Sequence, residues 1–142
     1  MRLRLLMLGK TRRPEVRAVF DDYIKRIARS APVEVNEVRD ADAAIKRLDA
    51  DRAATAILLD AGGKSQDSES LAHWLGEQRD RGAREIVFIC GDADGFPEEL
   101  RKRVSQKLSL SPMTYSHELA RVMLVEQLYR AFAILSGSPY PK

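Results

Sequence analysis

The sequence is poor in the residues that build metal sites and disulfide frameworks. It has one cysteine and two histidines among its 142 residues. A single cysteine cannot form an internal disulfide, and Cys90, His73 and His117 are too few and too far apart in the chain for a zinc cluster. We therefore expect no metal site, and a reducing cytoplasm suits this cysteine usage.

Long apolar runs and a dominant sign of charge are also missing. The run from Leu3 to Leu8 is short and contains Arg4, so we interpret it as a strand rather than a signal peptide, and we expect no membrane span. The 24 basic and 21 acidic residues leave a net charge of only +3. This small excess permits a nucleic-acid partner without arguing for one, because charge must be patterned to bind phosphate.

Several familiar motifs are absent. The sequence contains no Gly-x-Gly-x-x-Gly, no Gly-x-x-x-x-Gly-Lys-Ser/Thr and no Gly-x-Ser-x-Gly. These absences argue against a dinucleotide-binding fingerprint, a P-loop enzyme and a hydrolase with a nucleophile elbow. The acidic turn Gly91–Gly95 is not a calcium loop, because Arg103 stands where an EF-hand starting at Asp92 would need glutamate.

What is present is a regular alternation of strands and helices. The apolar spacing predicts strands at Arg2–Leu8, Val33–Val38, Thr55–Leu59, Glu85–Cys90 and Leu108–Ser111. It predicts helices over Glu15–Arg29, Ala41–Asp49 and Ser68–Arg81, and two more that start at Pro97 and at His117. This order predicts a single α/β domain over residues 1–142, with a five-stranded parallel sheet and helices on both faces. The third and fourth strands lack alternation and should be interior, and Ala61–Lys64 should form a turn.

Three strand ends should meet at one edge of this sheet. They are Leu59-Asp60, Cys90-Gly91 and Leu110-Ser111. Ligands of open parallel sheets gather at the carboxyl ends of the strands. The polar loop from Pro112 to Ser116, just before the last helix, has the composition of a ligand-binding loop. The turn Gly91–Gly95 could be a ligand loop or an ordinary connection, and both interpretations stay open.

Other polar features allow both a functional and a structural interpretation. His117 begins the last helix, where positive charge is disfavoured, so it could stay neutral and bond a substrate, or it could be a surface histidine. Arg130 follows Glu126 by four residues, which suits a surface ion pair or a phosphate ligand. A nucleic-acid face or a solvated face would each explain the basic residues near the first helix, which are Arg12, Arg13, Arg17, Lys25, Arg26 and Arg29.

The last helix has a wide apolar face. A fully buried helix would explain this face, and so would a helix that also covers a partner subunit. The residues that form it are Leu119, Val122, Met123, Val125, Leu128, Tyr129 and Phe132.

The C-terminal part of the sequence carries a resemblance to a known family. The Leu59-Asp60 turn, Gly91-x-x-x-Gly95, Leu-Ser-Leu-Ser-x-Met-Thr-Tyr-x-His from Leu108, and Glu-Gln-Leu-Tyr-Arg-Ala-Phe from Glu126 closely resemble the ribosomal large subunit methyltransferase H family. These are small SPOUT-type enzymes. The resemblance spans the chain and implies a parallel α/β fold with a C-terminal trefoil knot. It also implies a homodimer whose sites are completed by the partner subunit, and methyl transfer from S-adenosylmethionine to N3 of a pseudouridine in 23S rRNA of the assembled ribosome.

By position, the resemblance implies cofactor contacts at Leu59, Cys90, Gly91, Leu110, Ser111, Pro112, Met113, Thr114 and Tyr115. It places Arg130, His117 and Tyr140 near the target base, and we expect Arg130 to stabilise the anion that develops there. Two residues depart from the family pattern. Cys90 replaces a glycine, and Pro141 replaces the histidine after Tyr140, which removes a base at that position. The alternatives are a non-catalytic RNA-binding, ribosome-associated protein on the same fold and a flavodoxin-like nucleotide-binding module.

Overall fold

The five strands form one parallel sheet in the order β2-β1-β4-β3-β5. A computed structural model describes residues 1–51 and 54–140. The strands are β1 (Arg2–Leu8), β2 (Val33–Val38), β3 (Thr55–Ser65), β4 (Glu85–Cys90) and β5 (Gln106–Ser109). The predicted α/β class is confirmed, and β3 and β4 each have a neighbouring strand on both sides, as expected.

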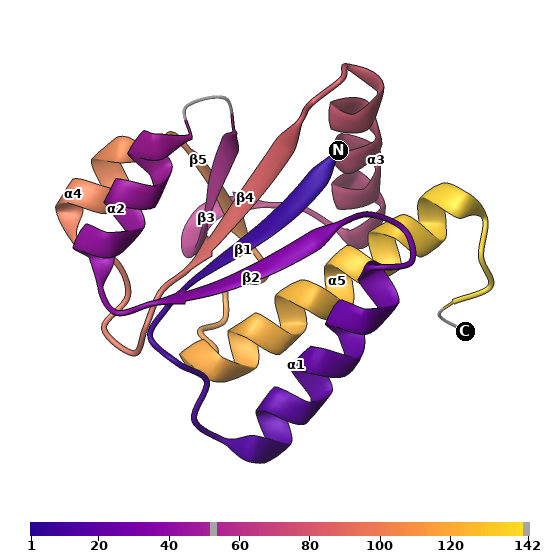
Figure 1. Cartoon of the computed structure of the whole chain (residues 1–142). Coiled ribbons are helices and arrows are strands. Elements are labelled where there is room, and N and C mark those ends of the chain that lie inside the picture. Colours follow the sequence, from indigo (N-terminus) through magenta and orange to yellow (C-terminus); the bar gives the residue numbers. More distant parts are fainter. Residues whose placement is uncertain (52–53, 141–142) are drawn as a thin grey trace.

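Helices cover both faces of this sheet (Figure 1). They are α1 (Pro14–Ile27), α2 (Ala41–Ala50), α3 (Ser68–Asp80), α4 (Glu98–Arg103) and α5 (His117–Ser136). The side chains of Asp40, Asp67 and Ser116 accept a backbone N–H at the starts of α2, α3 and α5. Such caps satisfy donors that have no partner within a helix, which explains why these helices begin where they do.

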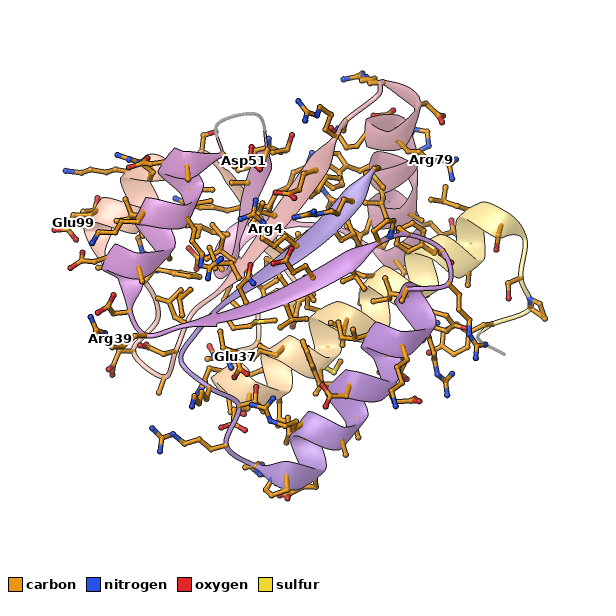
Figure 2. All side chains as sticks on the ribbon, viewed as in Figure 1. Arg4, Glu37, Arg39, Asp51, Arg79 and Glu99 are labelled. Carbon is orange, nitrogen blue, oxygen red and sulfur yellow. The ribbon has the colours of Figure 1, made fainter. Side chains whose placement is uncertain are left out.

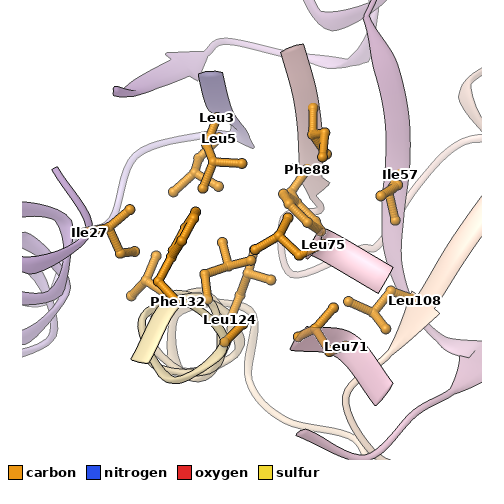
Figure 3. Close-up of a cluster of buried hydrophobic side chains, with 14 of the residues drawn as sticks. Leu3, Leu5, Ile27, Ile57, Leu71, Leu75, Phe88, Leu108, Leu124 and Phe132 are labelled. Carbon is orange, nitrogen blue, oxygen red and sulfur yellow. The ribbon is translucent and has the colours of Figure 1, made fainter. Parts of the chain in front are cut away.

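Two apolar clusters hold the layers together. The larger one joins α1, α3 and α5 to one face of the sheet, and the smaller one joins α2 and α4 to the other. Successive side chains of β1 point to opposite faces of the sheet, so Leu5 packs in the first cluster and Leu6 in the second. In the larger cluster, Phe88 of β4 lies beside Leu75 of α3 and close to Leu124 of α5 (Figure 3). Burial of each such side chain contributes roughly 1.5–3 kcal/mol, so α5 is an integral part of the core.

The prediction of a turn at Ala61–Lys64 is wrong. β3 continues to Ser65 and, after a register shift, pairs Lys64 with Leu108 of β5. Gly63 permits this close approach, since a Cβ there would lie 2.8 Å from the Cβ of Lys107. The extension depends on a partner strand more than forty residues away, so the local glycines indicated a turn instead.

Other boundaries differ by a few residues. α1 starts at Pro14 and ends at Ile27, whereas β5 runs from Gln106 to Ser109 rather than from Leu108 to Ser111. In α4, Pro97 is the capping residue rather than the first helical one. No helix within residues 1–51 and 54–140 combines the length and apolarity needed to cross a bilayer. The threading of the C-terminal segment into a knot remains a prediction.

Candidate functional site

A cavity of about 360 Å³ opens at the carboxyl end of β4, beside the middle of β3. Its wall is formed by the middle of β3, the connection from β4 to α4, Arg101 of α4, the loop before α5 and the first turn of α5. The three predicted segments do meet here, but only Cys90-Gly91 is a strand end, because Leu59-Asp60 lies within β3 and Leu110-Ser111 follows the end of β5. Every residue predicted to contact a cofactor lines this cavity except Pro112, namely Leu59, Cys90, Gly91, Leu110, Ser111, Met113, Thr114 and Tyr115. The role of these residues toward a cofactor remains a prediction.

The segment Gly91–Gly95 is both a tight connection and part of the cavity wall. The Gly95 N–H donates to the Asp92 carbonyl oxygen over 3.0 Å, and the Asp94 N–H donates to the Asp92 carboxylate over 2.8 Å. Gly91 faces the other end of this turn, and a Cβ on it would lie 2.9 Å from the Gly95 carbonyl oxygen. A side chain at Gly91 would therefore displace the wall of the cavity.

Cys90 adapts to its position without backbone strain. Among the described residues, only glycines have a positive φ, so Cys90 has an ordinary backbone conformation. Its side chain is buried, and burial raises the pKa of its thiol to about 12. The thiol is therefore protonated near neutral pH and is a poor nucleophile.

Two charged residues of the cavity wall were not among the predicted site residues. Arg101 of α4 forms an ion pair with Asp60, which follows Leu59 in β3. Burial alone would raise the pKa of Asp60, but the Gly62 N–H, at 3.2 Å, and the Arg101 guanidinium lower it below its usual value. The position of Asp60 directly after the apolar run Thr55–Leu59 was a usable signal, whereas nothing in the sequence placed Arg101 opposite it.

The loop before α5 is ordered by its own serines. The Ser109 hydroxyl donates to the Ser111 carbonyl oxygen over 2.9 Å, and the Ser111 hydroxyl accepts the Met113 N–H over 2.9 Å. Ser116 then caps α5, and His117 enters the cavity wall as the first helical residue. The loop thus presents its backbone to the cavity in a defined conformation.

Arg130 and Tyr140 lie away from the cavity and meet on one carboxylate. Glu126 accepts hydrogen bonds from the Arg130 Nε, at 3.1 Å, and from the Tyr140 hydroxyl, at 2.9 Å. The Tyr140 ring packs edge-on against Tyr129 with centroids 4.6 Å apart. The hydrogen bond with Glu126 raises the pKa of Arg130. Burial, together with hydrogen bonds to Tyr23 and Glu126, raises the pKa of Tyr140.

One protomer does not bring the three predicted catalytic residues together. His117 and Arg130 lie on the same helix, and a separation of thirteen residues corresponds to about 20 Å along its axis. Pro141, the other departure from the family pattern, lies outside the described residues. Within residues 1–51 and 54–140, no three His, Cys, Asp or Glu side chains are grouped to hold a metal ion.

Known proteins are similar to this chain in sequence and in fold. Residues 1–141 match the family described as "Predicted SPOUT methyltransferase". The chain is 44% identical to the ribosomal RNA large subunit methyltransferase H of Pelobacter propionicus, with 99% of each chain covered. It is 40% identical to that of Koribacter versatilis, with 99% and 97% covered.

Solved structures add to this comparison. The tRNA (m1G37) methyltransferase from Aquifex aeolicus superposes with a TM-score of 0.62 at 17% identity, over 100% of this chain and 75% of the other. The SpoU methyltransferase AviRb from Streptomyces viridochromogenes, in complex with AdoMet, gives 0.52 at 11% identity, over 96% and 58%. These two likenesses concern the fold alone. From its sequence matches, the chain belongs to the ribosomal RNA large subunit methyltransferase H family of SPOUT methyltransferases.

Proposed function

We propose that this chain transfers the methyl group of S-adenosylmethionine to N3 of a pseudouridine in 23S rRNA of the assembled ribosome. Family membership supports the coarser statement that it is a methyltransferase of large subunit rRNA. The observation that carries the proposal is the cavity at the end of β4, beside the middle of β3. Nearly all the residues that the resemblance assigns to the cofactor converge there, although they come from three separate parts of the sequence.

The cavity has the chemistry that this cofactor needs. Its volume of about 360 Å³ lies within the range of small-molecule sites. Leu59, Leu110 and Met113 offer apolar surface for a purine, and the serine-ordered loop offers backbone hydrogen-bonding groups. The paired charges of Asp60 and Arg101 suit the zwitterionic amino-acid end of the cofactor.

The chain's own contribution to the reaction is positioning and electrostatics. The bound cofactor supplies an electrophilic methyl group on a sulfonium. The protein must hold the acceptor nitrogen in line with the departing sulfur and must stabilise the charge left when N3 loses its proton. The positive charge of the Arg130 guanidinium would stabilise that anion. Glu126 is a positioning residue, since its carboxylate holds both Arg130 and the Tyr140 hydroxyl.

Arg130 can serve this cavity only from a second copy of the chain, because its own cavity lies about 20 Å away along α5. The proposal therefore includes a homodimer. Support comes from apolar side chains that remain exposed beside the cavity and along the start of α5. These are Met113 at 74%, Tyr115 at 37%, Leu119 at 45% and Met123 at 40% exposure. A patch of this kind is typical of a surface that a partner covers.

Calorimetry and methyl transfer test the proposal directly. We expect heat of binding with S-adenosylmethionine, and transfer of labelled methyl into ribosomes from a strain that lacks this modification. Assembled ribosomes should be better acceptors than free 23S rRNA, and the label should map to N3 of a pseudouridine. Ribosome binding without cofactor heat would support the non-catalytic alternative. Efficient transfer to free rRNA would contradict the assignment of the assembled ribosome.

Mixing two inactive variants tests the shared site. Gly91→Ala damages the cavity wall, and Arg130→Ala removes the cation. In a co-refolded equal mixture, half of the dimers are mixed and each has one intact site of two, so activity should return to about a quarter of wild type. A mixture as inactive as either variant alone would exclude completion of the site by the partner.

A further inference from the structure

The connection between β1 and α1, residues 9–13, is held in place by charged side chains of α5. The Glu118 carboxylate accepts the N–H groups of Arg12, at 3.0 Å, and of Arg13, at 3.1 Å. One turn further along, Arg121 donates to the Thr11 hydroxyl over 2.9 Å and to the carbonyl oxygen of Leu8 over 2.6 Å. Figure 1 shows this connection passing beside the start of α5.

The two side chains that hold this connection are costly to bury. Arg121 has no exposed surface, forms no ion pair within the part of the chain that the structure describes, and leaves its Nε without a hydrogen-bond partner. Glu118 is 7% exposed. A buried charge without a direct ion pair is costly even though the carboxylates of Glu118 and Glu37 attract Arg121 from a distance, and an apolar side chain of the same size would cost less. The arrangement therefore indicates that the position of this connection matters for something other than stability.

The side chains of the connection indicate this other role. Lys10 and Arg12 are exposed, and neither forms an ion pair among residues 1–51 and 54–140. Arg13 pairs only with exposed Glu15, at 3.0 Å, an interaction that is weak in water. The backbone is thus fixed from inside, while two or three cations remain available outside.

The backbone segment that carries these cations lies next to the cavity wall, and we call this segment the rim. Glu118 Oε2, which accepts the Arg12 N–H at 3.0 Å, is also 4.0 Å from Nε2 of His117. His117 belongs to the cavity wall. A single carboxylate oxygen therefore connects the basic segment to the site where the methyl group would be transferred.

We propose that Lys10, Arg12 and Arg13 bind phosphates of the rRNA that flank the target nucleotide, and that Glu118 and Arg121 are positioning residues for this contact. This inference rests on the proposed function, since it names the part of the surface that docks the RNA. Phosphate contacts set the register and orientation of a bound nucleic acid without reading its sequence. Here they would place one nucleotide over the cavity.

The test compares two double variants of equal charge. Lys10→Ala/Arg12→Ala removes two of the three cations at the rim, and Lys46→Ala/Arg47→Ala removes two exposed cations from α2, on the other face of the sheet. Binding of each protein to ribosomes is measured over a range of salt concentrations. The slope of log K for ribosome binding against log salt concentration should be less steep than in wild type by about 1.4 to 1.8 for the rim variant. The α2 variant should keep the wild-type slope. The KM of the rim variant for ribosomes should rise about tenfold while its affinity for S-adenosylmethionine is unchanged.

Equal slopes for the two variants and wild type would overturn the inference and leave the proposed function standing. A wild-type protein that binds neither ribosomes nor cofactor would overturn both. A wild-type protein that binds ribosomes but transfers no methyl group would contradict only the proposed reaction. The salt dependence of ribosome binding would still test the phosphate contacts at the rim.

Arg121→Met separates positioning from simple folding. In this background we expect Lys10→Ala/Arg12→Ala to cause little further loss of ribosome affinity, since the cations are no longer held at the rim. If the losses of ribosome affinity from Arg121→Met and from Lys10→Ala/Arg12→Ala are additive, Arg121 does not position the cations and its role is structural. Glu118→Gln provides the same comparison where Arg121→Met does not yield folded protein.

Discussion

The guanidinium of Arg121 donates a 2.6 Å hydrogen bond to the carbonyl oxygen of Leu8, from a side chain with no exposed surface. Two segments more than a hundred residues apart are joined in this way, the end of β1 and the second turn of α5. Since α5 also forms part of the cavity wall through His117, the contact ties the N-terminal basic segment to the candidate active site.

Arg121→Ala and Arg121→Met should differ in their effect on stability. Both variants leave the Thr11 hydroxyl and the Leu8 carbonyl oxygen without this donor, but alanine also leaves a cavity, so we expect it to lose about 3 kcal/mol in the free energy of unfolding. Methionine fills most of the space and removes the buried charge, which offsets the lost hydrogen bonds, so its variant should be close to wild type. Urea denaturation at neutral pH measures both. Equal losses in the two variants would contradict the view that the charge itself is costly.

The contribution of Glu118 should depend on pH. The N–H groups of Arg12 and Arg13 hold the pKa of Glu118 below its ordinary value of 4.5. A carboxylate with a lowered pKa in the folded state stabilises the fold above its unfolded pKa, and the stabilisation is lost as the pH falls through the folded pKa. The difference in stability between wild type and Glu118→Gln should therefore be constant near neutral pH and shrink below about pH 4.5. Urea titrations over this range check it, and a difference that does not change with pH would refute it.

Glu85 should be important for stability through a buried ion pair. Its carboxylate accepts the Arg4 Nε at 3.0 Å, and the Arg4 guanidinium also pairs with Asp51 at 3.0 Å (Figure 2). Glu85→Ala leaves the buried Arg4 without its main partner, so we expect a loss of about 3–5 kcal/mol in the free energy of unfolding.

The matched control for this prediction is Glu34→Ala. It breaks an exposed pair with Arg2, of 2.9 Å, and should cost about 1 kcal/mol or less. A comparable loss in both variants would show that burial does not set the importance of Glu85.

Cys90 should be unreactive in the folded protein. Its thiol is buried and its pKa is raised to about 12, so almost no thiolate is present. Iodoacetamide at about pH 8 should label the native protein far more slowly than the urea-unfolded protein, and mass spectrometry reads the difference. Rapid labelling of native protein would show that Cys90 is accessible at the cavity wall.

Arg130→Ala should affect turnover much more than cofactor binding. Loss of a cation that stabilises a developing anion typically lowers kcat on the order of a hundredfold. The affinity for S-adenosylmethionine should hold, because the proposal places Arg130 against the target base in the partner's cavity rather than against the cofactor. Arg81→Ala, at an exposed arginine after α3, is the control and should leave both quantities unchanged. If cofactor affinity falls as far as kcat, the assignment of Arg130 to the target base is wrong.

Local patterns were sufficient to predict most of the elements. Apolar runs and turn residues predicted the observed bounds of β1, β2 and β4, because these signals depend only on neighbouring residues. The meeting of Leu59-Asp60 with the end of β4 at one cavity also followed, since ligand sites of parallel sheets form at one edge of the sheet. The end of β3 was not predicted, because its last residues form a strand only where β5 pairs with them, and the bounds of β5 also differ from the prediction.

The sequence by itself thus determined the α/β class, the family and the segments that line the cavity, because repeated local patterns and a specific motif from Leu108 to Phe132 encode them. Only the tertiary structure decided the roles of several charged residues. Asp60 and Arg101 form a pair in the cavity wall, and Glu118 and Arg121 are buried under the basic segment. A charged residue on a helix is expected at the surface, and only contacts between distant segments reveal that its charge is held inside.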